Sequence, residues 1–312
     1  MSKGDKIDHY DVVILGGGAA GMAAALWCDE LGLTACLVDS ASKFGGQLHW
    51  IHNPIKNYPG YEFEHGGAAF RSFSKSLANR KFDQLSDCRA VSIDPSTLSV
   101  SLDGSRNLHA KAIVVATGVR RRTLDIPGAT EFRNNGILES GSRDRAQTSG
   151  RTAAVIGGGD AALENALILA DFAEKVYLLH RRQRFSGRKE FVNAVKKKER
   201  IELVLAAQVK EFGGGSALEF IDVELANGIS RRIAIDNAVV RIGVQPNSEL
   251  VREIVEVDDA GYIRVDREGR TTVSGIYAIG DVGNPVSPTL STAVGSAASA
   301  VKSIAASIRT SE

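Results

Sequence analysis

The chain has 312 residues, of which 43% are hydrophobic and 24% are charged, and its formal net charge is +1. This length predicts two domains at roughly 150 residues each. The balanced charge gives no field that would favour nucleic acid, and no apolar run approaches the roughly 20 residues that span a bilayer. The first apolar run already reads as a strand and not as a signal peptide, so we expect a cytoplasmic protein.

The three cysteines are too few and too scattered for a disulfide framework or a zinc site, and we predict no metal. Cys28 falls in a predicted helix and Cys36 in a predicted strand, where both are expected to be small buried hydrophobes. Cys88 lies at the edge of a meander and is also assigned a structural role.

A βαβ unit opens the chain. Residues 11–15 predict a strand, 22–31 an Ala-rich helix and 35–38 a second buried strand. Residues 88–102 and 108–115 predict a hairpin or meander that returns to a strand, since 98–102 alternates at the strand period.

The same order of elements then repeats. Residues 152–156 predict a strand, about 161–172 a helix, 176–179 a strand, about 202–235 a meander and 238–242 another strand. A last strand at 275–279 and an Ala/Ser-rich helix at about 292–308 close the chain. Two halves with one pattern indicate two copies of one dinucleotide-binding architecture.

The first glycine motif, Gly16–Gly21, fits G-x-G-x-x-G directly after a strand and at the start of a helix. Gly16 permits the tight turn, Gly18 lets a pyrophosphate approach the backbone, and Gly21 lets helix and strand pack closely. Asp39 ends the second strand, about 20 residues on, where a carboxylate holds ribose hydroxyls. The alternative is a plain glycine-rich turn.

The second motif, Gly157–Ala162, is the G-x-G-x-x-A form, and the residues that end its second strand are His180–Arg182. Guanidinium groups match a 2′-phosphate and a carboxylate would repel it, which favours NADP over NAD. The alternative is a solvated basic loop. Arg184 and Arg188 lie further on, and the sequence does not say which of them points inward.

In these motifs and their order, the chain resembles the low-molecular-weight thioredoxin reductase family and its thiol-independent relatives over nearly its whole length. The matching segments are Gly16–Gly21, Gly45–Leu48, Asn57–Gly60, Ala116–Gly118, Gly157–Ala162, His180–Arg182 and Gly280–Asp281.

The resemblance implies an α/β fold of two Rossmann-type, three-layer ββα domains, the second inserted into the first. Residues 1–119 and 243–312 would bind FAD, and residues 120–242 would bind NADPH. It also implies a homodimer whose NADPH domain rotates about hinge strands near 118–120 and 242–244.

The family's cofactor-binding residues can be carried over by position. Asp281 would bind the ribitol–phosphate region, Asn57 would lie near the flavin, and Arg181 with Arg182 would hold the 2′-phosphate. The implied FAD set is Gly16, Gly18, Ala19, Ala20, Asp39, Gly46, Gln47, Leu48, Asn57, Ala116, Thr117, Gly118, Gly280, Asp281, Thr292 and Ala293. The implied NADP set is Gly157, Gly159, Asp160, Ala161, His180, Arg181, Arg182 and Arg188.

The chain departs from the family at its redox-active Cys-x-x-Cys, because the matching stretch here is Ser140–Arg143. Serine cannot cycle between dithiol and disulfide. A second departure is His49, Trp50 and His52 after the Gly-Gly-Gln-Leu segment. These three residues are our candidates for a proton donor and a stacking platform, and Asn57 is a further catalytic candidate because the resemblance places it near the flavin. The alternative is packing under the flavin or at a dimer contact.

Two basic runs have no assigned role. Arg120–Arg122 would dock an acidic partner protein or form a solvated loop, and Lys196–Lys198 indicates the exposed face of a helix.

The sequence therefore predicts a FAD-dependent NADPH oxidoreductase that passes electrons to an unidentified small molecule or redox protein without an internal dithiol. The alternatives are a disulfide reductase that works through partner thiols and a non-catalytic flavin-binding redox sensor. No nucleic acid or membrane partner is expected.

Overall fold

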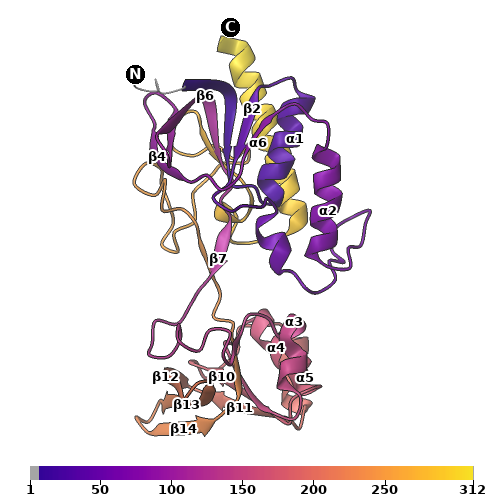
Figure 1. Ribbon diagram of the computed structural model, residues 1–312, viewed down its shortest axis with the longest axis vertical. Helices are drawn as coiled ribbons and strands as arrows, with labels where there is room; N and C mark the ends of the chain where they lie inside the picture. Colours follow the sequence, from indigo (N-terminus) through magenta and orange to yellow (C-terminus); the bar gives the residue numbers. More distant parts are fainter. Residues whose placement is uncertain (1–6, 312) are drawn as a thin grey trace. The chain divides into compact units, whose positions relative to one another are not determined.

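The computed structural model describes residues 7–311 and divides into two compact units (Figure 1). Unit 1 runs as far as Arg120 and resumes at Gln245, while unit 2 is Arg121–Val244. The second unit is therefore inserted into the first. Among the described residues, no helix combines the length and apolarity that crossing a membrane would require.

Unit 1 is built on a largely parallel sheet with helices against it. Its strands are β1 (Ile7–Leu15), β2 (Ala35–Val38), β3 (Asp83–Leu85), β4 (Ala90–Asp94), β5 (Ser99–Leu102), β6 (Arg106–Val115) and β17 (Ile276–Ala278). Its helices are α1 (Ala19–Glu30), α2 (Gly66–Leu77) and α6 (Leu290–Ser311), with short 3₁₀ helices at Gly46–Trp50 and Gly280–Val282.

Strand order in unit 1 explains how one sheet carries both parallel and antiparallel pairs. The order is β3-β2-β1-β6-β5-β4, and β17 also pairs with β6. The end of β6 nearest the glycine loop pairs in parallel with β17, whereas its beginning pairs antiparallel with β5. The predicted meander over 88–102 is confirmed, since β4 and β5 form an antiparallel hairpin.

Alternation along β1 divides the core of unit 1 into two layers. Val12 and Ile14 are buried with residues of α1 and α6, which cover one face of the sheet (Figure 1). Val13 and Leu15 are buried on the other face with the chain around 251–263. Successive side chains of a strand point to opposite faces, so both faces of β1 are apolar.

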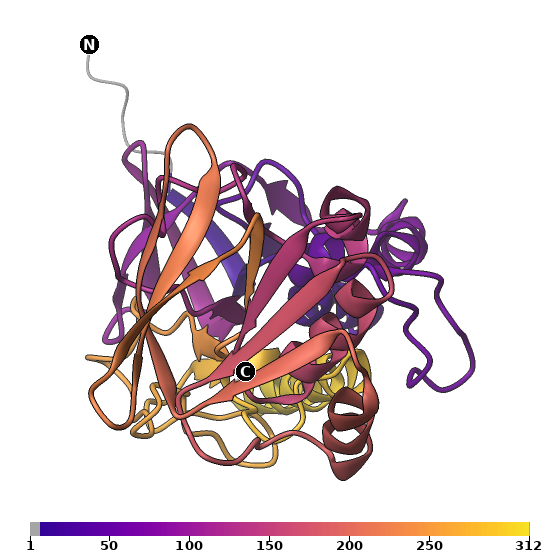
Figure 2. The same cartoon turned by 90° about the horizontal axis from the view of Figure 1, so that it is seen from below.

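Unit 2 repeats the plan of a parallel sheet with helices and an antiparallel meander. Its parallel sheet has the order β11-β10-β9-β15-β8, and a separate antiparallel sheet has the order β12-β13-β14 (Figure 2). The strands are β8 (Ile137–Leu138), β9 (Thr152–Ile156), β10 (Lys175–His180), β11 (Ile201–Leu205), β12 (Ala207–Gly214), β13 (Leu218–Leu225), β14 (Ser230–Ala234) and β15 (Asn237–Val240). The helices are α3 (Gly141–Asp144), α4 (Asp160–Ala170) and α5 (Lys189–Lys197), with a 3₁₀ helix at Arg145–Thr148.

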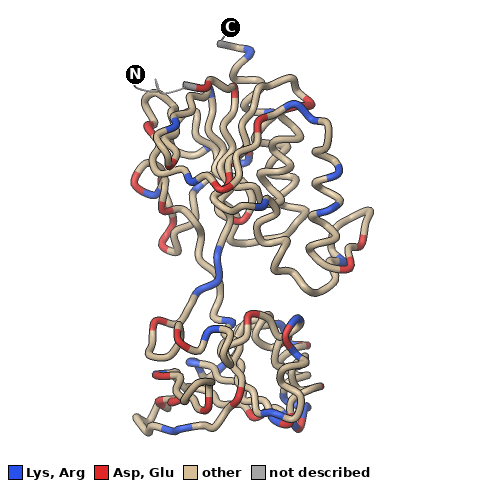
Figure 3. Tube along the Cα trace, viewed as in Figure 1, with Lys and Arg blue, Asp and Glu red and all other residues tan. Residues whose placement is uncertain are grey.

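The parallel sheet of unit 2 has a core on each side. Ala154 and Ile156 pack with Phe212 and Ile221 of the meander, while Val155 packs with α4 on the opposite face. This arrangement is the predicted three-layer ββα order. The chain passes from unit 1 into unit 2 and later returns, as its Cα trace shows (Figure 3). These two connections contain β7 (Val119–Arg121) and β16 (Val244–Pro246), which pair as a two-stranded sheet.

The predicted elements agree best where the buried run is short and apolar. The strands expected at 35–38 and 152–156 have the observed bounds of β2 and β9. The first helix begins at Ala19 instead of residue 22, because it starts directly at the glycine loop. Helix α2 was not predicted: it opens with two glycines, which disfavour helix, and it is held by packing of Ala69, Phe70 and Phe73 in a separate apolar cluster.

Candidate functional site

The first glycine loop joins β1 to α1, and each glycine of the motif has a distinct steric reason. Gly16 has φ of +109°, and a Cβ added there would lie 2.4 Å from the carbonyl oxygen of Ala116. A Cβ at Gly21 would lie 1.8 Å from the carbonyl oxygen of Gly16, so helix and loop touch there. A Cβ at Gly18 meets nothing within 4 Å. The one open glycine is the one expected to face a pyrophosphate.

The N-terminus of α1 is available to an anion. Its N-cap residue is Gly18, no side chain caps it, and its first turn contains no acidic residue. The first N–H groups of such a helix lack intrahelical partners and carry the positive end of the helix dipole. These residues therefore fit the phosphates of a dinucleotide.

Asp39 follows β2 and lies beside the glycine loop. Its Oδ2 accepts a hydrogen bond from the backbone N–H of Gly17 at 2.6 Å, and its Oδ1 accepts one from Ala41 at 2.7 Å. A carboxylate has roughly four acceptor positions, so both oxygens can still accept from ribose hydroxyls.

Four separate motifs of unit 1 meet around Gln47. Its Nε2 donates to Oδ2 of Asp281 at 3.0 Å, and a Cβ at Gly118 would lie 3.8 Å from the same nitrogen. A Cβ at Gly46 would lie 3.1 Å from Cα of Gly18. Burial raises the pKa of Asp281, and the hydrogen bond from Gln47 opposes that rise. Segments from residues 16, 46, 117 and 281 thus form one local group.

The start of α6 joins this group through a loop contact. The hydroxyl of Ser291 donates to the carbonyl oxygen of Asn57 at 3.2 Å. Thr292 is held by hydrogen bonds within the turn that begins the helix, and Ala293 is buried. Asn57 and Thr292, both assigned to FAD by resemblance, therefore lie on neighbouring segments.

Two residues that sequence reasoning missed hold these segments in place. The side chain of Asn247 donates to the carbonyl oxygen of Thr117 at 2.8 Å, and the Thr117 hydroxyl donates to the carbonyl of Asn247 at 2.6 Å. The hydroxyl of Ser296 accepts from the N–H of Gly280 at 3.0 Å. Asn247 follows a proline, which marks a turn-like segment in the sequence. Ser296 lies within a helix, and no sequence pattern indicates its contact.

The three aromatic candidates after Leu48 occupy different environments. The Nε2–H of His49 donates to the carbonyl oxygen of Phe44 at 2.7 Å, and its ring meets Phe70 edge-on at 4.7 Å. Trp50 is 52% exposed, and His52 is half-buried. The structure thus gives His49 a local structural contact, and the roles of all three toward an acceptor stay predictions.

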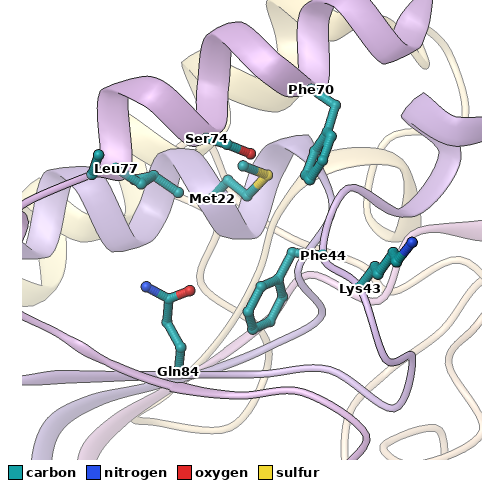
Figure 4. Close-up of a pocket in the computed structure, with 8 residues that line it drawn as sticks. Met22, Lys43, Phe44, Phe70, Ser74, Leu77 and Gln84 are labelled. Atoms are coloured by element: carbon teal, nitrogen blue, oxygen red, sulfur yellow. The ribbon is translucent and has the colours of Figure 1, made fainter.

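A small recess in unit 1 does not coincide with the predicted FAD residues. Its volume is about 260 Å³, which is below the roughly 300–1,000 Å³ usual for a ligand pocket. Figure 4 shows it between α1, α2 and Gln84, with Met22, Phe44 and Phe70 around it. None of its lining residues belongs to the predicted FAD set. The ring of Phe44 also requires glycine at position 17, where a Cβ would lie 2.1 Å from it.

The second glycine loop joins β9 to α4 in unit 2. Gly157 has φ of +150°, and a Cβ there would lie 2.0 Å from the carbonyl oxygen of Arg241. A Cβ at Gly158 would lie 2.3 Å from the ring of His180. At Gly159 the nearest atom would be 3.9 Å away. As in unit 1, the third glycine of the motif faces open space.

His180 is a structural part of this loop and not a source of charge. Its ring stacks on Phe185 at 5.5 Å, and Nε2–H donates to the carbonyl oxygen of Arg184 at 3.1 Å. Burial lowers the pKa of His180, and the neighbouring Arg182 and Arg181 lower it further. The imidazole is therefore neutral, and positive charge here comes from the guanidinium groups.

The predicted 2′-phosphate ligands differ in how they are held. Arg181 and Arg182 are exposed, and among the described residues neither side chain has an ion pair. Arg188 instead binds Asp160: its N–H donates at 2.6 Å and its Nε at 2.8 Å to the two carboxylate oxygens. Arg188 also lies 4.5 Å over the ring of Phe191. Arg181 and Arg182 are thus available to a phosphate, and Arg188 already has a partner.

An ion pair lies in the stretch that the resemblance matches to the family's dithiol. Ser140 is the N-cap of α3, and its backbone N–H donates to Oδ2 of Asp144 at 3.0 Å. The guanidinium of Arg143 binds both carboxylate oxygens of Asp144, at 2.6 and 2.9 Å. Asp144 is 7% exposed, so the pair is fixed in place. No thiol chemistry is available from this stretch.

The cysteines are free thiols, and Cys28 and Cys36 are fully buried as predicted. Burial raises the pKa of each of these two thiols to about 12. Burial also raises the pKa of Cys88, which is half-buried. At neutral pH these thiols are protonated and poor nucleophiles. Within residues 7–311, no group of three or more His, Cys, Asp or Glu is placed to hold a metal ion.

Comparison with known proteins gives the class of the molecule. Residues 10–302 match the pyridine nucleotide-disulphide oxidoreductase family model. The chain is 31% identical over 276 residues to a thioredoxin reductase of Mycoplasmopsis pulmonis, covering 88% of this chain and 89% of that one. It is also 31% identical to a bifunctional thioredoxin reductase/thioredoxin of Mycobacterium leprae, and this match covers 88% of this chain and 60% of that longer protein.

Solved structures agree with this result. A thioredoxin reductase of Lactococcus lactis in its FR conformation matches with a TM-score of 0.84 and 28% identity over 95% of this chain and 97% of that chain. The chain therefore belongs to the pyridine nucleotide-disulphide oxidoreductase family. Within that family it is a thioredoxin reductase-like FAD-dependent NAD(P)H oxidoreductase, and the predicted fold class is confirmed. FAD and NADPH are the cofactors of the thioredoxin reductase family.

Proposed function

We propose that the chain transfers a hydride from NADPH to FAD and then passes electrons to an external acceptor without an internal dithiol. The observation that carries this proposal is the Arg143–Asp144 ion pair at the dithiol position. When bound, FAD supplies two-electron chemistry and NADPH supplies the hydride, while the protein binds and orients both.

The two units divide the binding work in this proposal. In the predicted FAD-binding domain, residues 1–119 with 243–312, the open N-terminus of α1, Asp39 and the Gln47–Asp281 pair would hold FAD. In the predicted NADPH-binding domain, residues 120–242, the Gly157 loop with Arg181 and Arg182 would hold NADPH. The remaining FAD and NADP residues predicted above stay part of this proposal, as do the homodimer and the cytoplasmic location.

A second candidate is a disulfide reductase that works through partner thiols. It is favoured by the names of the similar proteins, which are thioredoxin reductases. In that case the thiols must come from the partner, because Cys28 and Cys36 are buried and their pKa values are about 12.

The test is an anaerobic titration of the FAD-loaded protein with NADPH, followed by steady-state NADPH oxidation with a panel of acceptors. We expect uptake of two electrons per FAD and turnover with quinones, free flavins or redox proteins. Turnover confined to disulfide substrates would favour the second candidate, and the absence of flavin reduction would indicate a redox sensor.

A further inference from the structure

Three arginines gather at the ends of β8 and β15 in unit 2. Glu139 follows β8, and its carbonyl oxygen accepts from Nη1 of Arg121 and from Nη2 of Arg241, each at 2.7 Å. Two guanidinium groups therefore share one oxygen atom. Arg143 lies near enough to Arg121 to lower the pKa of Arg121, although burial is the larger cause. Arg121, Arg143 and Arg241 are called the arginine cluster below.

The charges within this cluster are not balanced. Asp144 is bound by Arg143, and the carboxylate of Glu139 lies 3.8 Å from Arg121 and 3.4 Å from Arg133. In the part of the chain that the structure describes, the guanidinium of Arg241 donates only to two carbonyl oxygens, those of Val240 and Glu139. Four guanidinium groups thus face two carboxylates, and Arg241 has no carboxylate partner.

Arg241 shows the electrostatic cost of this arrangement. Burial lowers the pKa of Arg241 to about 10, and the neighbouring Arg121 contributes to the decrease. The side chain stays protonated at neutral pH; the nearby carboxylates of Glu139 and Asp144 favour its charged form, and Arg121 opposes it. A bound anion would relieve this repulsion, because opposite charges at short range favour the ionised form. Planar guanidinium groups also match the two oxygens of a carboxylate or phosphate.

The cluster lies at the carboxyl ends of the strands of the parallel sheet, as does the second glycine loop. Across the parallel sheet, Arg181 follows β10, Gly157 follows β9, Arg241 follows β15 and Glu139 follows β8. The N–H of Arg241 donates to the carbonyl oxygen of Ile156, next to Gly157, at 2.7 Å. In open α/β sheets ligands bind outside the carboxyl ends of the strands. The cluster is thus on the side of the glycine loop away from Arg181.

We propose that Arg121, Arg143 and Arg241 form an oxyanion site for a carboxylate or phosphate group of a small molecule, separate from the 2′-phosphate loop. The arginines come from three segments: Arg121 and Arg241 bind one carbonyl oxygen, and Arg143 lies near Arg121. The site is therefore built by the fold and not by one basic run. If the proposed function holds, the ligand is an acidic electron acceptor. This identification of the ligand, called the acceptor step below, rests on the proposed function, whereas the anion site itself does not.

The anion site is tested with inorganic phosphate on the FAD-loaded protein, at constant ionic strength and with saturating NADP⁺ to fill the 2′-phosphate loop. We expect saturable phosphate binding that weakens by about tenfold or more in Arg241→Met, the loss of roughly one charged hydrogen-bonding partner. The side chain of Arg121 is 39% exposed, so Arg121→Met gives the same test without a substitution in the buried core. Arg232→Met on β14 removes the same charge from an ion pair with Asp222 and should bind phosphate normally.

Two outcomes overturn the anion site: no saturable phosphate binding once NADP⁺ is present, or equal weakening in Arg232→Met. The acceptor step is tested separately with riboflavin and FMN, which differ by one phosphate. We expect kcat/KM to favour FMN in the native protein and to lose that preference in Arg121→Met. An unchanged preference refutes the acceptor step. No NADPH-driven turnover with either flavin would instead refute the proposed function and leave the phosphate measurement to decide the site.

Discussion

The two glycine loops of this chain share a backbone plan and differ in charge. Each follows a buried parallel strand, opens a helix without a side-chain cap, and leaves its third glycine in open space. At the end of the next strand, unit 1 has Asp39, which accepts from the N–H of Gly17, whereas unit 2 has His180, whose ring covers Gly158. Under the proposed function both loops hold phosphates, and the charge at the end of the second strand selects the dinucleotide.

The helices that follow these loops also differ at their first turns. Helix α1 has no acidic residue there, while α4 begins with Asp160, which is paired with Arg188. A carboxylate at that position would repel a phosphate, so the pair with Arg188 offsets its charge. Because Arg188 is already paired with Asp160, we expect Arg181 and Arg182 to be the ligands of the phosphate.

The largest expected effect comes from removing the positive charges that follow the second strand of unit 2. Replacing Arg181 and Arg182 together by Ala removes two charged contacts of about 1.5–3 kcal/mol each. The ratio of kcat/KM for NADPH to that for NADH should fall by about 100-fold or more. The same double change at Arg231 and Arg232, which lie on β14 and pair with acidic residues, should leave the ratio unchanged. Equal kcat/KM values for NADPH and NADH in the native protein would contradict the assignment of Arg181 and Arg182 to the 2′-phosphate.

Next in size is the steric requirement that both loops share. Gly16→Ala places a Cβ 2.4 Å from a backbone oxygen at φ of +109°, so we expect a loss of about 2–5 kcal/mol in the free energy of unfolding. Gly32→Ala is the matched control, since Gly32 also has positive φ but nothing lies within 4 Å of its Cβ position. Thermal or denaturant unfolding of both variants measures the difference. Equal losses would show that backbone conformation alone sets the cost.

A smaller effect is expected at Asp281, which accepts a hydrogen bond from Gln47 of another motif of unit 1. Asp281→Ala removes the carboxylate that accepts from Gln47, and we expect FAD to bind about 10–150-fold more weakly. The ratio of flavin to protein absorbance after dialysis checks this result. Asp259→Ala, at an exposed position of the same unit, should keep its flavin. Full flavin retention in Asp281→Ala would remove this residue from the FAD site.

The smallest effect on electron transfer is expected from the cysteines. The triple variant Cys28→Ser, Cys36→Ser, Cys88→Ser should lose stability by about 1–3 kcal/mol for each buried hydroxyl. Each folded, FAD-loaded molecule should still accept two electrons from NADPH and reduce an artificial acceptor. Four-electron uptake by the native protein that falls to two in the triple variant would reveal a thiol redox centre. Such a result would refute the proposal that this chain works without an internal dithiol.

The sequence by itself determined the features that rest on local rules. Short apolar runs such as 35–38 and 152–156 gave the bounds of buried strands, because a strand buried on both faces needs a continuous apolar run. The two glycine motifs specified tight turns before helices, since Gly16 and Gly157 have positive φ. The missing cysteines at 140 and 143 were equally visible, because thiol chemistry requires the sulfur atom itself.

Tertiary structure decided everything that depends on distant contacts. Helix α2 forms despite its initial glycines because its apolar side chains pack in a separate cluster. Asn247 binds Thr117 across 130 positions of sequence, and no local pattern encodes such a pair. The same holds for Arg121, Arg143 and Arg241, which meet only because the strands β8 and β15 end at one edge of the sheet. Periodicity and spacing report which face a residue takes, whereas the identity of its partner is set by how the strands and helices pack.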